Sequence, residues 1–151
     1  IWVCHALSAN SDVSDWWKNM FGKGKIYDPE KHFIVCANML GSCYGSTCAR
    51  SISPTTQKAY GVEFPLVSIR DIARAHNLLR KHLGIEEIEL CIGGSCGGHQ
   101  VMEFAYLLPA KIKKVASRAT LRRLYSFFAS RVRRGAIFQK CFSFFQILGA
   151  L

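Results

Sequence analysis

Short apolar runs alternate with amphipathic stretches along the first two thirds of the chain. Residues 1–4 and 33–37 are apolar runs, and the second is typical of a strand buried on both faces of a sheet. Residues 88–92 predict a third strand, and residues 69–83 and 97–108 carry apolar positions at helical spacing. Because strands and helices alternate, the pattern predicts an α/β fold with a mostly parallel sheet covered on both faces.

The helix boundaries have recognisable signals. Ser68 and Asp71 have the spacing of a capping box, Gly84 supplies a C-cap, and Pro109 ends the second helix. Residues 14–20 predict a further short helix that carries two tryptophans. The expected apolar stripe of the first long helix consists of Ile72, Ala75, Leu78, Leu79 and Leu83.

Two segments depart from this regular pattern. Residues 38–64 are rich in Gly, Ser, Thr and Tyr and predict a long loop, which in a compact domain is usually functional or disordered. Residues 113–115 predict the approach to another strand, which Ser117 and the arginines at 118, 122 and 123 are expected to interrupt.

The formal charge of +10 on the 151 residues is unevenly distributed. Residues 1–110 hold 10 basic and 10 acidic side chains, whereas residues 111–151 hold 10 basic and none that is acidic. Taken whole, the charge suggests a nucleic acid or an acidic membrane as partner. Divided in this way, it says nothing of that kind about the first 110 residues.

The seven cysteines do not follow a metal-binding or redox spacing. Cys43 and Cys48, like Cys91 and Cys96, are separated by four residues, where zinc knuckles and redox motifs have two. No cationic leader precedes the apolar start of the chain. We therefore expect reduced, mostly buried thiols in a cytoplasmic protein, and no metal site.

Residues 93–97, Gly-Gly-Ser-Cys-Gly, match the pattern G-x-S-x-G. The motif follows a predicted strand and opens a predicted helix, which is the setting of a nucleophile elbow. Gly93 and Gly97 would let strand and helix approach closely, and Ser95 would be the catalytic nucleophile, held in a strained backbone conformation. The alternative is a glycine-rich turn without a chemical role.

An oxyanion formed on attack by Ser95 needs hydrogen-bond donors. The backbone N–H of Cys96, at the start of the helix, would be one donor. A second should come from the loop after an earlier strand, where His5, Ala6 and Leu7 lie.

Four ordered blocks carry a family resemblance, and they comprise residues 5–10, 38–47, 64–71 and 92–98. Together they resemble homoserine O-acetyltransferase, an acyltransferase family with the α/β-hydrolase fold. The resemblance covers residues 1 to about 115 and implies a partial fold of that type, incomplete at both ends. Thr47-Cys48-Ala49 stands where the family has Thr-Gly-Pro, so the long loop is expected to differ.

The resemblance implies a ping-pong acyl transfer in methionine biosynthesis. Ser95 would take the acetyl group from acetyl-CoA, and the hydroxyl of L-homoserine would attack the acyl-enzyme, with the N–H groups of Leu7 and Cys96 as oxyanion donors. It implies small-molecule partners, without nucleic acid, membrane, metal or bound cofactor, and leaves a homodimer of a full-length parent open. A homoserine O-succinyltransferase and a serine esterase of the same fold are the alternatives.

The catalytic triad is incomplete in this chain. In this fold the base and its carboxylate follow the nucleophile, yet after Ser95 the sequence has only His99 and Glu103, both on the elbow helix. We expect neither to serve. The chain alone should therefore be inactive or nearly so.

The last segment has a different character. From residue 104 to the end there is no Asp or Glu, and residues 116–151 form a basic, Phe-rich tail that does not match the family. A shifted reading frame or a truncated gene is the favoured interpretation. The alternatives are a non-catalytic nucleic-acid-binding tail and a membrane-binding amphipathic helix, whose apolar face would contain Leu121, Leu124, Phe128 and Val132.

Overall fold

A four-stranded parallel sheet forms the centre of the computed structural model, which describes residues 1–118. The strand order is β2-β1-β3-β4. The predicted α/β fold with a parallel sheet is confirmed. Along the chain the elements are β1 (Trp2–Cys4), α1 (Val13–Trp16), the 3-10 helix η1 (Lys18–Met20), β2 (Val35–Cys36), the 3-10 helix η2 (Gly61–Glu63), α2 (Ile69–His82), β3 (Cys91–Gly94), α3 (Cys96–Leu107) and β4 (Val115–Arg118).

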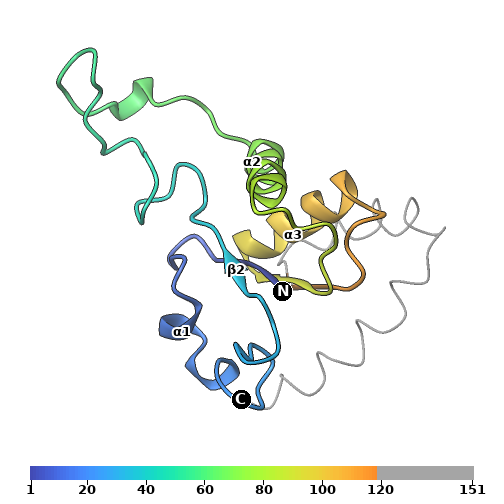
Figure 1. Ribbon diagram of the computed structural model, residues 1–151. Helices are drawn as coiled ribbons and strands as arrows, with labels where there is room; N and C mark the ends of the chain where they lie inside the picture. Colours follow the sequence, from blue (N-terminus) through green and yellow to red (C-terminus); the bar gives the residue numbers. More distant parts are fainter. Residues whose placement is uncertain (119–151) are drawn as a thin grey trace.

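Both faces of the sheet are covered. Helices α2 and α3 lie together on one side of the sheet, and α1 lies on the other (Figure 1). Since side chains alternate along a strand, Trp2 and Cys4 pack with Ala73 and Phe104 of the two long helices, whereas Val3 packs into the opposite layer. The opposite layer also contains Val13, Tyr27, Ile92 and Ala116.

Helix α2 begins as its sequence predicts. The Ser68 side chain accepts from the Asp71 N–H, and the Asp71 carboxylate accepts from the Ser68 N–H at 3.0 Å, which completes the capping box. The predicted apolar stripe is wrong in part, because Leu78 is 69 % exposed. Leu83 is 41 % exposed as well, whereas Ile72 of the predicted stripe is buried together with Ala73, His76 and Arg80.

Two predictions in the first forty residues need correction. The run 33–37 forms only a two-residue strand, β2, at the edge of the described sheet, and it is half-buried rather than buried on both faces. Phe33 is 68 % exposed. The predicted helix 14–20 is interrupted at Trp17, whose ring stacks on that of Tyr27 with centroids 5.5 Å apart.

Strand β4 continues further than the sequence suggested. The expected interruption at Ser117 and Arg118 is wrong, because both residues lie in β4. The Ser117 hydroxyl is buried and donates to the Gly98 carbonyl at 2.9 Å, so its polar group is satisfied inside the fold. The predictions for the amphipathic face of residues 121–132 and for the rest of the tail lie outside the described residues.

The predicted loop over residues 38–64, hereafter the arm, is confirmed as a segment that extends away from the sheet and helices (Figure 1). Its regular structure consists of η2 and an isolated antiparallel bridge between Ile52 and Ala59. Among the helices of residues 1–118, none is both long and apolar enough to cross a bilayer.

Candidate active site

The G-x-S-x-G motif forms a tight turn between β3 and α3. Ser95 has φ 55° and ψ −125°, a conformation that non-glycine residues rarely adopt. Its side chain is exposed and makes no capping hydrogen bond to α3. The predicted strand–turn–helix setting and the strained serine are both present.

The two motif glycines are required by packing. A Cβ on Gly97 would lie 2.0 Å from the Cys4 carbonyl oxygen and 2.8 Å from that of His5. A Cβ on Gly93 would lie 2.6 Å from the Gly97 carbonyl oxygen. These neighbours are backbone atoms that cannot turn aside, so only glycine fits at either position. The predicted close approach of strand and helix is therefore present.

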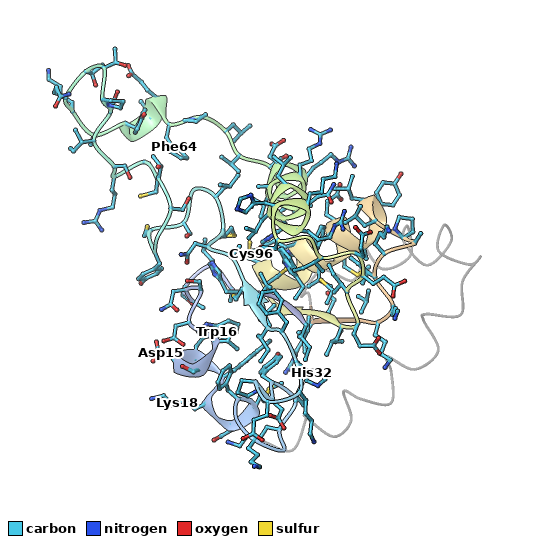
Figure 2. The ribbon with its side chains drawn as sticks, in the orientation of Figure 1. Asp15, Trp16, Lys18, His32, Phe64 and Cys96 are labelled. Atoms are coloured by element: carbon cyan, nitrogen blue, oxygen red, sulfur yellow. The ribbon has the colours of Figure 1, made fainter. Side chains whose placement is uncertain are left out.

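Cys96 is the first residue of α3 and lies two positions after the end of β3 (Figure 2). Its thiol contacts the Met39 sulfur at 3.6 Å, and burial raises the pKa of this thiol above its ordinary value. The Cys96 side chain is thus neutral and packs against Met39. Its backbone N–H belongs to the first helical turn, where N–H groups have no partner within the helix. This N–H stays a predicted oxyanion donor.

Ser95, the predicted nucleophile, is also tied to the neighbouring strand. The Ser95 N–H donates to the Arg118 carbonyl at 2.7 Å, which links the elbow to the end of β4. That N–H already has an acceptor in the sheet.

Leu7 lies in the turn that follows β1. The turn is closed by a bond from the Ala9 N–H to the Ala6 carbonyl at 3.0 Å, and the Leu7 side chain is 64 % exposed. Two residues earlier, the His5 backbone meets Gly97. The fold thus brings the start of this turn to the elbow, while the role of Leu7 as a donor stays a prediction.

A buried hydrogen-bond network underlies this junction. The Met39 N–H donates to His5 Nε2 at 2.9 Å, so the proton of this ring lies on Nδ1, 2.7 Å from the Ala6 carbonyl oxygen. Gln100 Nε2 donates to the His5 carbonyl at 3.2 Å. These bonds hold the entry to the Leu7 turn against α3 and the beginning of the arm.

The network continues into the core. The Gln100 side-chain oxygen lies 3.1 Å from His76 Nε2, and Trp2 Nε1 donates to His76 Nδ1 at 3.3 Å. His76 therefore carries its proton on Nε2 and donates to Gln100. Burial lowers the pKa of His76, which keeps the ring neutral.

The sequence reasoning missed this network. One signal could have found it, because His76 lies four residues after Ile72 and three after Ala73, on the buried face of α2. A polar residue on an apolar helix face needs a buried partner. That the partner is Gln100 becomes known only from the tertiary structure.

The two candidates for a triad after Ser95 are used differently. Glu103 accepts from Arg70 Nε at 2.6 Å, an ion pair between α3 and α2. His99 Nε2 is buried and has no hydrogen-bond partner among the described residues. Glu103 thus does not orient His99 through that nitrogen, in keeping with the expectation that the pair does not serve.

Other candidate sites in residues 1–118 are few. No group of three or more His, Cys, Asp or Glu residues there could hold a metal ion. A cleft of about 420 Å³ beside α1 and β2 is lined by residues that include Asp12, Phe21, His32 and Cys36. None of the predicted site residues lines it.

A parallel sheet with helices on both faces, and a strained serine at a strand-to-helix turn, define the class of this protein. Residues 1–146 match the alpha/beta hydrolase fold family, and the chain belongs to that family. The fold predicted from the motifs is therefore confirmed.

Within this class the chain is similar to homoserine O-acetyltransferases. It is 48 % identical to the enzyme of Nostoc punctiforme over 121 residues, which cover 80 % of this chain and 34 % of the relative. It is 50 % identical to that of Chlorobium chlorochromatii over 107 residues, which cover 71 % and 30 %. The chain thus spans about a third of the length of these relatives.

Solved structures agree. Homoserine O-acetyltransferase from Bacillus anthracis is similar with a TM-score of 0.70 and 26 % identity, over 77 % of this chain and 35 % of that chain. The acetyl esterase MekB is similar with a TM-score of 0.66 and 29 % identity, over 83 % and 36 %. The suspected resemblance to the acetyltransferase family is confirmed.

Proposed function

We propose that this chain is the nucleophile-bearing part of a homoserine O-acetyltransferase. The observation that carries the proposal is the elbow, where Ser95 is exposed at φ 55° between two glycines that no other residue could replace. The identity of 46–50 % to several homoserine O-acetyltransferases supports the particular reaction.

The proposed reaction has two acyl-transfer steps. Ser95 Oγ attacks the thioester carbonyl of acetyl-CoA, CoA leaves as the thiol, and an acetyl-serine ester remains. The hydroxyl of L-homoserine then attacks this ester, which gives O-acetylhomoserine and frees the serine. In both steps the backbone N–H groups of Leu7 and Cys96 stabilise the oxyanion.

The remaining features of the proposal follow from this chemistry. The acyl donor is a substrate, so neither a resident cofactor nor a metal is required. The proposed product is a methionine precursor, and the proposed compartment is the cytoplasm, where thiols such as those of this chain stay reduced. Because neither His99 nor Glu103 is expected to complete the triad, this chain alone is expected to stop at slow acylation.

The decisive experiment is active-site labelling of the full chain with an activated acetyl ester. We expect acetylation of Ser95 in the peptide that contains the elbow, found by mass spectrometry, and none at that peptide in Ser95→Ala. The Ser11→Ala variant, at another exposed serine, is the matched control and should label as the unaltered chain does. Acetyl groups only on lysines or cysteines, with Ser95 unmodified, would disprove the role of Ser95 as nucleophile.

To identify the acyl donor and the acceptor, the assay needs a protein of the relatives' length. Such a parent containing this segment should use acetyl-CoA in preference to succinyl-CoA. The similarity to the acetyl esterase MekB favours a second candidate, in which water replaces homoserine as acceptor. The ratio of O-acetylhomoserine to free acetate separates the two, and a product that is acetate alone supports the esterase.

A further inference from the structure

Gln100 is a fully buried amide on the elbow helix. It lies five residues after Ser95, and none of its surface is exposed. Its Nε2 donates to the His5 carbonyl at 3.2 Å, and its side-chain oxygen accepts from His76 Nε2 at 3.1 Å. The bond to His76 joins α3 to α2. The bond to His5 instead joins the helix that carries the predicted nucleophile to the turn that contains Leu7.

The His5 carbonyl is the point where this turn meets the elbow. β1 ends one residue earlier, at Cys4. The His5 carbonyl oxygen would lie 2.8 Å from a Cβ on Gly97, so it packs against the first turn of α3 as well as against the Gln100 amide. Because the amide holds this carbonyl, the chain leaves the strand in a fixed direction.

The next peptide group carries the Leu7 N–H. Its carbonyl, that of Ala6, accepts from the Ala9 N–H at 3.0 Å and lies 2.7 Å from His5 Nδ1. No cis peptide bond occurs in residues 1–118. In a trans peptide group the C=O and the N–H point in opposite directions. The Leu7 N–H is therefore turned away from the Ala9 N–H and from the His5 ring.

Both predicted oxyanion donors have a free N–H. Among residues 1–118, neither the Leu7 N–H nor the Cys96 N–H has a hydrogen-bond acceptor. An oxyanion site needs donors whose direction is already fixed, since they need not reorient when charge develops on the substrate. At Leu7 that direction is set by the bonds of the two peptide groups before it.

We propose that Gln100 is a positioning residue for acyl transfer, which holds the His5 carbonyl so that the Leu7 N–H keeps the orientation of an oxyanion donor. The inference rests on the proposed function, in which Ser95 is acylated. Gln100 acts through two successive peptide groups rather than on the substrate itself. Its loss should therefore slow the acylation step and leave the binding of the acyl donor unchanged.

The test measures how fast an activated acetyl ester acylates Ser95 in the full chain, over a range of ester concentrations. Removing one oxyanion donor outright slows catalysis by about 10²–10³-fold, whereas Gln100→Leu only displaces a donor, so we expect the limiting rate constant to fall at least about tenfold. The ester concentration at half the limiting rate should change by less than about twofold. Gln100→Met, which keeps the length of the side chain, should show the same pattern.

Two variants separate this role from a general loss of stability. His76→Leu removes the other partner of the same amide but leaves the bond to the His5 carbonyl, so stability should fall while the limiting rate stays within about threefold. Arg70→Gln breaks the ion pair with Glu103, another contact of α2 with α3, and should leave acylation unchanged. An equal fall in rate in His76→Leu and Gln100→Leu would overturn the proposal.

A second measurement follows the donor directly. A fluorophosphonate that reacts with Ser95 leaves a tetrahedral group with an oxygen where the oxyanion would form. We expect amide hydrogen exchange at Leu7 to slow at least about tenfold on this adduct in the unaltered chain, and to stay unchanged in Gln100→Leu. Slower exchange at Leu7 in both proteins, or in neither, overturns the role of Gln100. If Ser95 takes up neither reagent, the proposed function fails, and the role of Gln100 fails with it.

Discussion

The elbow and the arm both depend on glycines, yet for different reasons. At the elbow, a Cβ on Gly97 would lie 2.0 Å from the Cys4 carbonyl oxygen, so tertiary packing excludes any side chain. In the arm, Gly61 has φ +54° but nothing within 4 Å of the position of a Cβ. The elbow is thus determined by contacts among three elements, and the arm by local backbone conformation. A region of the first kind can hold a strained residue such as Ser95, because its surroundings leave no alternative.

The largest effect should come from filling the elbow. Gly97→Ala places a methyl group against backbone atoms of β1, and we expect a loss of about 3 kcal/mol or more in the free energy of unfolding. Gly94→Ala is the matched control, since nothing lies within 4 Å of its Cβ. Urea unfolding of the full chain, followed by tryptophan fluorescence, measures both. Equal losses in the two variants would show that the close approach at Gly97 does not constrain the fold.

The next effect concerns the network beneath the elbow. Gln100→Leu leaves the buried His76 Nε2–H without an acceptor and should cost about 1–3 kcal/mol. The double variant with His76→Leu should lose less than the sum of the two single changes, because both polar groups are then absent. Additive losses in this double-mutant cycle would indicate that the two side chains are not coupled.

The network also predicts a dependence on pH. Burial lowers the pKa of His76 in the folded chain, while the unfolded chain keeps a value near 6.5. Below about pH 6.5 the unfolded state binds the extra proton, so stability falls with acidification until the folded pKa is passed, by about 1.4 kcal/mol per unit of pKa difference. Unfolding curves between pH 8 and 5 should show a shallower slope for His76→Gln. An unchanged slope would argue against a neutral, buried His76.

The smallest effect should lie in the arm. Gly61→Ala meets no neighbour and bears only the cost of the left-handed conformation, about 1–2 kcal/mol. We expect faster amide hydrogen exchange at Tyr60, whose N–H binds the Ser51 carbonyl, with the exchange of β3 unchanged. If β3 exchanged faster as well, the arm would share the cooperative unit of the elbow.

Local features of the site could be predicted from the sequence. The elbow followed from glycines spaced around Ser95 between a strand and a helix, because the steric demands of that turn act over five residues. The cap of α2 followed from Ser68 and Asp71 for the same reason. Phe33 could not be placed in this way, since its exposure depends on whether another strand lies beside β2.

The buried polar groups mark the limit of local reasoning. His76 and Gln100 are separated by 24 positions, and only the packing of α2 on α3 brings them together. The stripe predicted for α2 was wrong in part for the same reason. Apolar Leu78 is exposed, while polar His76 and Arg80 are buried because their side chains find acceptors inside.

The sequence by itself determined the strand–turn–helix motif, its strained serine and the family to which the chain belongs, because these depend on residue types at short spacing. Only the tertiary structure brought His76 and Gln100 together beneath the elbow. The two residues are 24 positions apart, and the packing of α2 on α3 places His76 Nε2 3.1 Å from the Gln100 side-chain oxygen. Spacing along the chain sets a distance only after the backbone conformation between the residues is fixed.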